Sequence, residues 1–77
     1  MLITYPIQMT QRDQANCLYN TGLVLRDTER YEEARTALRE ALELYRQVDG
    51  TQRDQANCLY NTGLILRILI RRRRYPR

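Results

Sequence analysis

The chain has 77 residues, 43% of them hydrophobic, and its 13 basic residues are all Arg. A chain of this length forms at most one small domain with a modest core. It contains no His and only two Cys, which excludes the common metal-ligand sets and leaves a His-based catalytic site without its general base.

The charge is divided unevenly along the chain. Residues 1–66 carry seven Arg against nine acidic residues, whereas residues 67–77 carry six Arg and no acidic residue. The body is therefore mildly acidic, and the net charge of +4 arises at the C-terminal end. The most apolar stretch, residues 63–70, contains Arg67 and is far shorter than the roughly 20 residues that span a bilayer.

Two features bear on the location of the protein. Residues 1–9 contain Pro6 and no basic leader, so we expect an N-terminal extension and no secretory signal. Cys17 and Cys58 lie 41 residues apart, a spacing that allows a disulfide, but the pattern favours ordinary buried thiols in a reducing compartment. We therefore expect a soluble cytoplasmic protein without a membrane span.

An internal repeat organises the sequence. The fourteen residues TQRDQANCLYNTGL begin at Thr10 and again at Thr51. The match continues for three more residues, with Val24 replaced by Ile65, so that seventeen aligned positions differ once. A copy of this quality indicates that one structural unit is used twice.

The first copy predicts a helix over about residues 11–26. Thr10 and Asp13 resemble an N-terminal capping box, and the same pair recurs as Thr51 and Asp54. Small and apolar residues follow at spacings of three, four and three, which form one stripe of a helix. These residues are Ala15, Leu18, Gly22 and Leu25.

Two further helices complete an all-α prediction. Asp27 or Thr28 is expected to cap the second helix, and Gly50 is expected to end it in the left-handed conformation. The third helix should run from about Gln52 into the arginine run and end before Pro76. The stripe that predicts the second helix comprises Tyr31, Ala34, Leu38, Ala41, Leu42 and Tyr45.

The helical hairpin resembles the tetratricopeptide repeat (TPR), whose pattern is large-x-x-L-G-x-x-Y followed by A-x-x-x-F and a later Ala. RYEEA, at residues 30–34, is similar to a common start of that family's second helix. The family positions are occupied here by Leu18, Thr21, Gly22, Leu25, Ala34, Leu38 and Ala41. The resemblance implies antiparallel helical hairpins of a right-handed α-solenoid, about one and a half repeats long.

Several positions depart from the usual pattern. Thr21 stands in place of Leu, Leu25 in place of an aromatic residue, and Arg46 in place of the closing Pro. The period is 41 residues, similar to the long repeats of kinesin light chains and of bacterial regulatory TPR proteins. We expect residues 10–50 to form the first repeat, residues 51–70 a first helix of a second repeat that acts as a cap, and residues 71–77 a basic tail.

The resemblance implies a non-catalytic protein–protein interaction module, a scaffold that binds a peptide or a partner helix in a groove. Catalytic residues, metal ligands and cofactors are not expected, and Asp13 and Asp54 are best explained as caps. Each copy carries one polar and aromatic face at helical spacing, whose Asn amides suit peptide backbone and whose Tyr rings offer apolar area. The candidate binding residues are Asn16, Tyr19, Asn20, Leu23, Asn57, Tyr60, Asn61 and Leu64.

Alternatives remain open at this stage. Asn20 and Asn61 could bond to each other or to neighbouring backbone, and Tyr19 and Tyr60 could pack in the core. The run Arg71, Arg72, Arg73 and Arg74 could bind nucleic acid or an acidic surface, although few aromatic residues are interleaved for base stacking. A third possibility is self-assembly into a homo-oligomer, because a solenoid of less than two repeats leaves apolar faces open.

Overall fold

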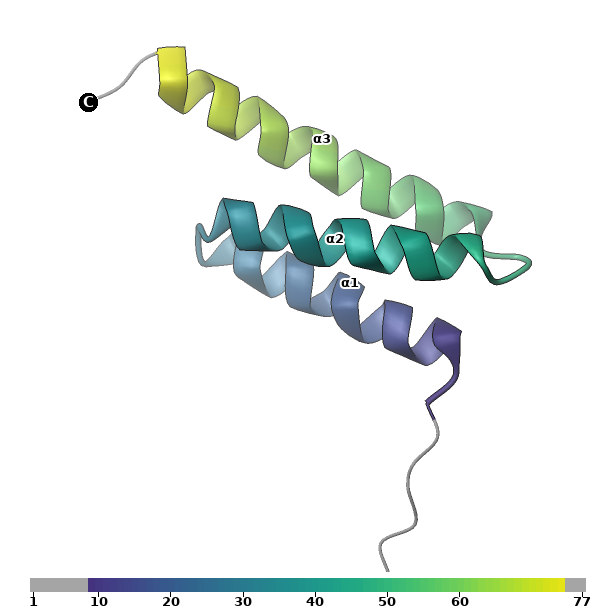
Figure 1. The fold of residues 1–77 in the computed structure, drawn as a ribbon. Helices are drawn as coiled ribbons and strands as arrows, with labels where there is room; N and C mark the ends of the chain where they lie inside the picture. The colour runs from purple at the N-terminus through teal and green to yellow at the C-terminus, as the bar shows by residue number, and fades with distance from the viewer. Residues whose placement is uncertain (1–8, 75–77) are drawn as a thin grey trace, which may run out of the picture.

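The structure is a computed structural model that describes residues 9–74. Three helices follow in order: α1 at Gln11–Asp27, α2 at Tyr31–Arg46 and α3 at Gln52–Arg74. All regular structure in the described part is helical (Figure 1), which confirms the all-α prediction. The arginines at positions 71–74 continue α3 as its last turn, so the helix does not stop at residue 70.

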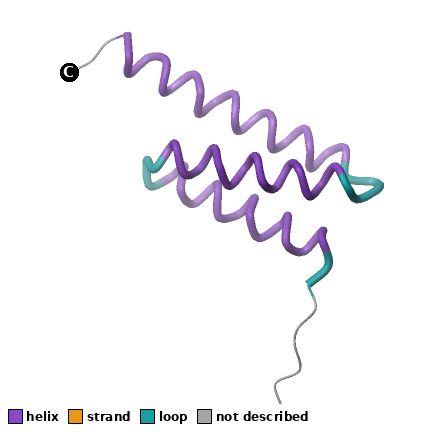
Figure 2. Tube along the Cα trace, viewed as in Figure 1, coloured by secondary structure: helices purple, strands orange, loops and turns teal. Residues whose placement is uncertain are grey.

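Helix α2 lies between the other two helices (Figure 1). The two connecting turns lie at opposite ends of the molecule, as Figure 2 shows, and neighbouring helices therefore run antiparallel. Two apolar clusters join the helices: one centres on Ala41, Leu42 and Tyr45, the other on Ala34 and Leu38. Burial of these α2 side chains from both sides supplies the main stabilisation of so small a fold.

The close approach of α1 and α2 depends on Gly22. A Cβ atom added there would lie 2.9 Å from Cγ and 3.0 Å from Cδ2 of Leu38. Ala34 and Leu38 are fully buried opposite this point. Absence of a side chain at Gly22 therefore allows the Leu38 side chain to rest on the α1 backbone.

The turn between α1 and α2 differs from the sequence prediction. The Thr10–Asp13 capping box at the start of α1 is present. The N-cap of α2 is Arg30, however, which makes no side-chain capping bond. The Thr28 hydroxyl instead donates to the carbonyl groups of Val24 and Leu25, at 3.0 and 3.1 Å, and so caps the end of α1.

Backbone hydrogen bonds also close the end of α1 in this turn. Glu29 has φ of 63°. The Arg30 N–H donates to the Leu25 carbonyl at 2.8 Å, and the Glu29 N–H donates to the Arg26 carbonyl at 3.0 Å. This is the pattern of a Schellman motif, which satisfies the free carbonyl groups at the end of α1.

The turn between α2 and α3 confirms one expectation and corrects another. Gly50 has φ of 78°, the left-handed conformation that its position predicts. Thr51 is fully buried, and its hydroxyl lies 2.5 Å from the Tyr45 carbonyl and 2.8 Å from the Val48 carbonyl. The Thr51 side chain therefore binds the end of α2 and does not form the capping box that the repeat predicts.

Candidate binding face between the first and third helices

A buried asparagine connects α3 to α1. Asn61 is 6% exposed, and Nη1 of Arg26 donates to its Oδ1 at 2.5 Å. Its Nδ2 donates to the Tyr19 hydroxyl at 3.2 Å and to the Asn57 carbonyl at 2.9 Å. Both ends of the amide are thus satisfied, as burial of a polar side chain requires.

The position of Asn61 follows from the helical periodicity of α3. Cys58, Asn61 and Ile65 are separated by three and four residues and form the stripe of α3 that is buried against the other helices. On α1, Tyr19 and Arg26 are seven residues apart and lie on one face. Arg26 also pairs with Asp27 at 3.1 Å.

Candidate binding residues at equivalent positions of the two repeat copies have different surroundings in the structure. The Tyr45 hydroxyl donates to Asn16 Oδ1, so Asn16 is tied to α2. Asn20 and Asn57 are exposed, and within the described residues neither side chain makes a hydrogen bond. Tyr60 is 66% exposed, and Leu23 and Leu64 are half-buried on their helices.

Of the alternatives left open, the structure supports backbone bonding for Asn61 and packing for Tyr19. Asn61 donates to the carbonyl of Asn57, one turn earlier, and no hydrogen bond joins the described side chains of Asn20 and Asn61. Tyr19 packs against both apolar clusters. Arg26 was not predicted as a member of this network, although its spacing of seven residues from Tyr19 places both side chains on the same face of α1.

The comparison with protein families agrees with this geometry. The sequence model of the tetratricopeptide repeat matches residues 13–71. The chain belongs to the tetratricopeptide repeat family. The match covers α2 and most of α1 and α3. Comparisons with curated proteins and with solved structures find no match.

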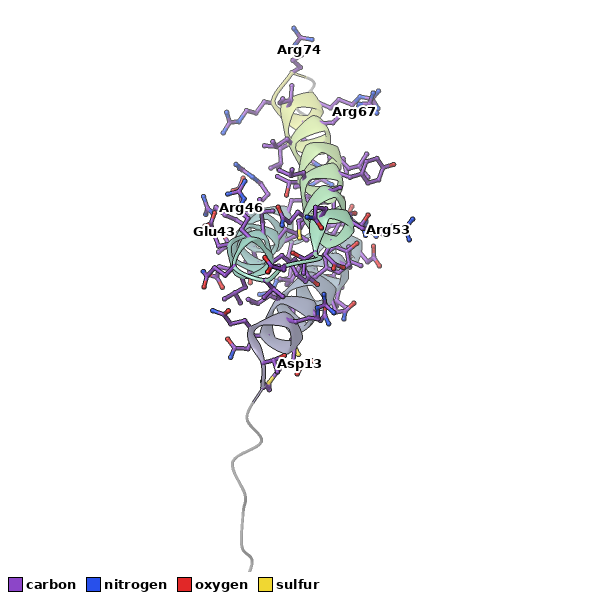
Figure 3. The ribbon with its side chains drawn as sticks, turned by 90° about the vertical axis from the view of Figure 1, so that its right-hand side faces the viewer. Asp13, Glu43, Arg46, Arg53, Arg67 and Arg74 are labelled. Atoms are coloured by element: carbon purple, nitrogen blue, oxygen red, sulfur yellow. The ribbon has the colours of Figure 1, made fainter. Side chains whose placement is uncertain are left out.

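The arginine run of this TPR chain is divided between two sides of α3. The Arg72 guanidinium lies 4.9 Å from the ring centroid of Tyr31 and pairs with Glu29 at 3.1 Å, which ties α3 to the start of α2. Arg67, Arg71 and Arg74 make no ion pair among the described residues. Figure 3 shows the side chains of Arg67 and Arg74 extending away from the other two helices.

The buried ionisable side chains of the TPR core are held neutral. Burial, assisted by the Asp54 carboxylate, raises the pKa of the Cys58 thiol to about 11. Burial likewise raises the pKa of Tyr45 to about 12, and Asp54 again adds to the effect. Cys17 and Cys58 are both free thiols, but Cys17 is exposed, contrary to the expectation of two buried thiols.

Two further observations concern metal binding and membranes. Within residues 9–74 no group of three or more His, Cys, Asp and Glu side chains is placed to hold a metal ion. None of the described helices is long and apolar enough to cross a membrane. The TPR fold is a repeat scaffold, and repeats of this family generally mediate protein–protein interactions.

Proposed function

We propose that the chain is a non-catalytic interaction module that binds an extended peptide or a partner helix along the face where α1 and α3 meet. The observation that carries this proposal is the fixed amide of Asn61, held by Tyr19 and Arg26. It sets the spacing of the two helices and so fixes the exposed side chains beside it. A preorganised surface of this kind loses little conformational entropy on binding.

The residues on this face divide into two groups. Tyr19, Arg26 and Asn61 form its floor and are committed to one another. The exposed or half-buried neighbours are free to contact a ligand: the amides offer both donors and acceptors to a peptide backbone, and a Tyr ring adds apolar area with little rotamer entropy. The proposed contact residues are Asn20, Leu23, Asn57, Tyr60 and Leu64.

The test compares two neighbouring residues of α3. Peptides are selected against the wild-type chain from a random display library, and their affinity is then measured for Tyr60→Ala and for Leu59→Ala. Tyr60 and Leu59 are both exposed, but they point about 100° apart around the helix. We expect Tyr60→Ala to weaken binding about tenfold or more and Leu59→Ala to leave it unchanged.

Either of two results would contradict the proposal: equal affinity of Tyr60→Ala and wild type, or a loss confined to Leu59→Ala. A second variant, Asn57→Ala, tests the polar contribution and is expected to give a smaller loss. Asn61→Ala is unsuitable here because it removes the hydrogen bonds from Asn61 to Arg26 and Tyr19 that join α3 to α1.

Nucleic-acid binding by the arginine run is the weaker candidate. Arg72 is committed to Tyr31 and Glu29 within the chain. The arginines without such partners, Arg67, Arg71 and Arg74, border an apolar surface of α3, which indicates a protein ligand more than a phosphate backbone.

A further inference from the structure

Helix α3 has an apolar stripe that the described chain leaves largely exposed. Leu59 is 55% exposed, Ile70 is also exposed, and a Cβ atom added at Gly63 would meet no atom within 4 Å. A shallow hollow lies over this stripe and is lined by Gly63, Leu66, Arg67, Ile70, Arg71 and Arg74. We call Leu59, Gly63, Leu66 and Ile70 the open stripe.

In the first copy of the repeat, the equivalent stripe on α1 is covered by a helix. On α1 the same positions are Leu18, Gly22 and Leu25, and these pack against α2. Gly22 lies directly under Leu38, whose Cγ would be 2.9 Å from an added Cβ. Leu59, Gly63 and Leu66 occupy the same positions of the repeat on α3. The open stripe therefore has the shape and chemistry of a docking surface for an α2-like helix.

We propose that the open stripe docks an amphipathic helix of a partner protein, antiparallel to α3, with small residues and one Leu facing Gly63 and with acidic residues in its first turn. This surface is distinct from the face between α1 and α3. The direction follows from α2, which runs antiparallel to α1 on the equivalent stripe (Figure 1).

Charge complementarity specifies the acidic end of the partner. An antiparallel helix places its first turn beside the C-terminal part of α3, where Arg67, Arg71 and Arg74 are exposed and unpaired among the described residues. Helix α2 itself carries Glu32 and Glu33 in its first turn. Acidic residues there are favoured both by the arginines and by the dipole of the partner helix.

A second copy of this chain is a poor source of the partner helix. Its own α2 is buried from both sides, with Ala34, Leu38 and Ala41 fully buried and Tyr45 nearly so. Offering α2 to another molecule would unfold the donor. We therefore assign the docked helix to a different protein that has the α2 pattern on a free or weakly held segment.

The probe is a synthetic peptide with the sequence of residues 29–47, blocked at both ends and titrated into the intact chain. A free peptide of this length is marginally helical in water, so binding should increase the total helical signal in circular dichroism. We expect saturable one-to-one binding, with amide shifts in NMR spectra confined to the open stripe and its arginine border. Shifts that spread through α1 would mean that the peptide displaces α2, and this would overturn the proposal.

The decisive variant is Gly63→Leu. Nothing contacts the Gly63 position, and Leu favours a helix more than Gly does, so the chain should keep its helix content. We expect at least a tenfold loss of affinity, because the added side chain occupies the space where the peptide's Leu38 must lie. Unchanged affinity in this variant would overturn the proposal.

Three further controls test the contribution of the arginine charges, the location of the binding site and self-association of the chain. Arg71→Glu should weaken binding several-fold, while Arg53→Glu, at the exposed N-terminal end of α3 (Figure 3), should not. Tyr60→Ala should leave peptide binding intact, which distinguishes failure here from failure of the proposed function. If sedimentation shows a dimer that excludes the peptide, the open stripe belongs to a second copy and the proposal is wrong.

Discussion

Helices α1 and α3 begin with nearly the same seventeen residues and yet bury different sides. On α1, Ala15 and Gly22 are buried, and the equivalent Ala56 and Gly63 on α3 are exposed. The reverse holds for a second set of positions. Cys58, Asn61 and Ile65 are buried on α3, whereas Cys17, Asn20 and Val24 are exposed on α1.

The two buried stripes lie nearly half a turn apart around the helix. Helix α1 is followed by α2 and has no helix before it in the described chain, whereas α3 is preceded by α2 and has none after it. The repeated sequence therefore has one stripe that packs against the helix that follows it and a second stripe that packs against the helices that precede it. Position in the stack, and not local sequence, decides which stripe is used.

The single substitution in the repeat makes this comparison testable. Val24 is 62% exposed and its counterpart Ile65 is fully buried. Ile65→Ala should lower the free energy of unfolding by about 2–5 kcal/mol, because it leaves a cavity between α2 and α3. Val24→Ala should change it by less than about 0.5 kcal/mol. Urea unfolding followed by circular dichroism measures both.

For so small a domain the Ile65→Ala variant is expected to lose most of its cooperative unfolding transition at 25 °C. Retention of the full wild-type midpoint would show that α3 is not anchored through this residue. Equal losses in the two variants would show that both copies are buried alike, as in a longer stack or an oligomer.

Substitution of the equivalent residues Asn20 and Asn61 should also change the free energy of unfolding unequally, but by less. Asn61→Ala removes the partner of Arg26 and Tyr19 and should cost about 1–3 kcal/mol. We expect a loss of unfolding free energy near the lower end of this range, because Arg26 retains its ion pair with Asp27. Asn20→Ala should be neutral or slightly stabilising, since Ala favours a helix more than Asn does.

A double-mutant cycle sharpens this prediction. Combining Asn61→Ala with Tyr19→Phe should give less than the sum of the two single effects, because both remove the same hydrogen bond. Strict additivity would mean that the Asn61–Tyr19 hydrogen bond contributes nothing to stability.

Local signals predicted the helices well. The α1 capping box and the left-handed Gly50 depend on neighbouring residues alone. Periodicity and such signals also predicted the bounds of α1 and the start of α3, but not the start of α2, whose N-cap is Arg30 and not Asp27 or Thr28. Gly22 could also be assigned to close packing from its place in the stripe. These features need no knowledge of which helix lies where.

The roles of repeated residues could not be predicted in this way. The sequence assigned Asn20 and Asn61 the same function, but only Asn61 has helices on the side where its amide points. Thr51 differs from Thr10 for the same reason: the end of α2 lies beside it and offers carbonyl groups. Arg72 was predicted to lie in a basic tail, whereas its contacts with Glu29 and Tyr31 require α3 to pass the start of α2.

The two cysteines allow the same comparison of α1 and α3 through the reactivity of their thiols, without a mutation. Cys17 is exposed, whereas Cys58 is buried with its pKa raised to about 11. At pH 8 only about 0.1% of Cys58 is therefore thiolate, the form that reacts with alkylating agents. We expect iodoacetamide to modify Cys17 rapidly and Cys58 only as fast as the core opens, which mass spectrometry of the digested chain resolves. Denaturant should equalise the two rates, and equal rates without denaturant would mean that α3 is not docked on the preceding helices.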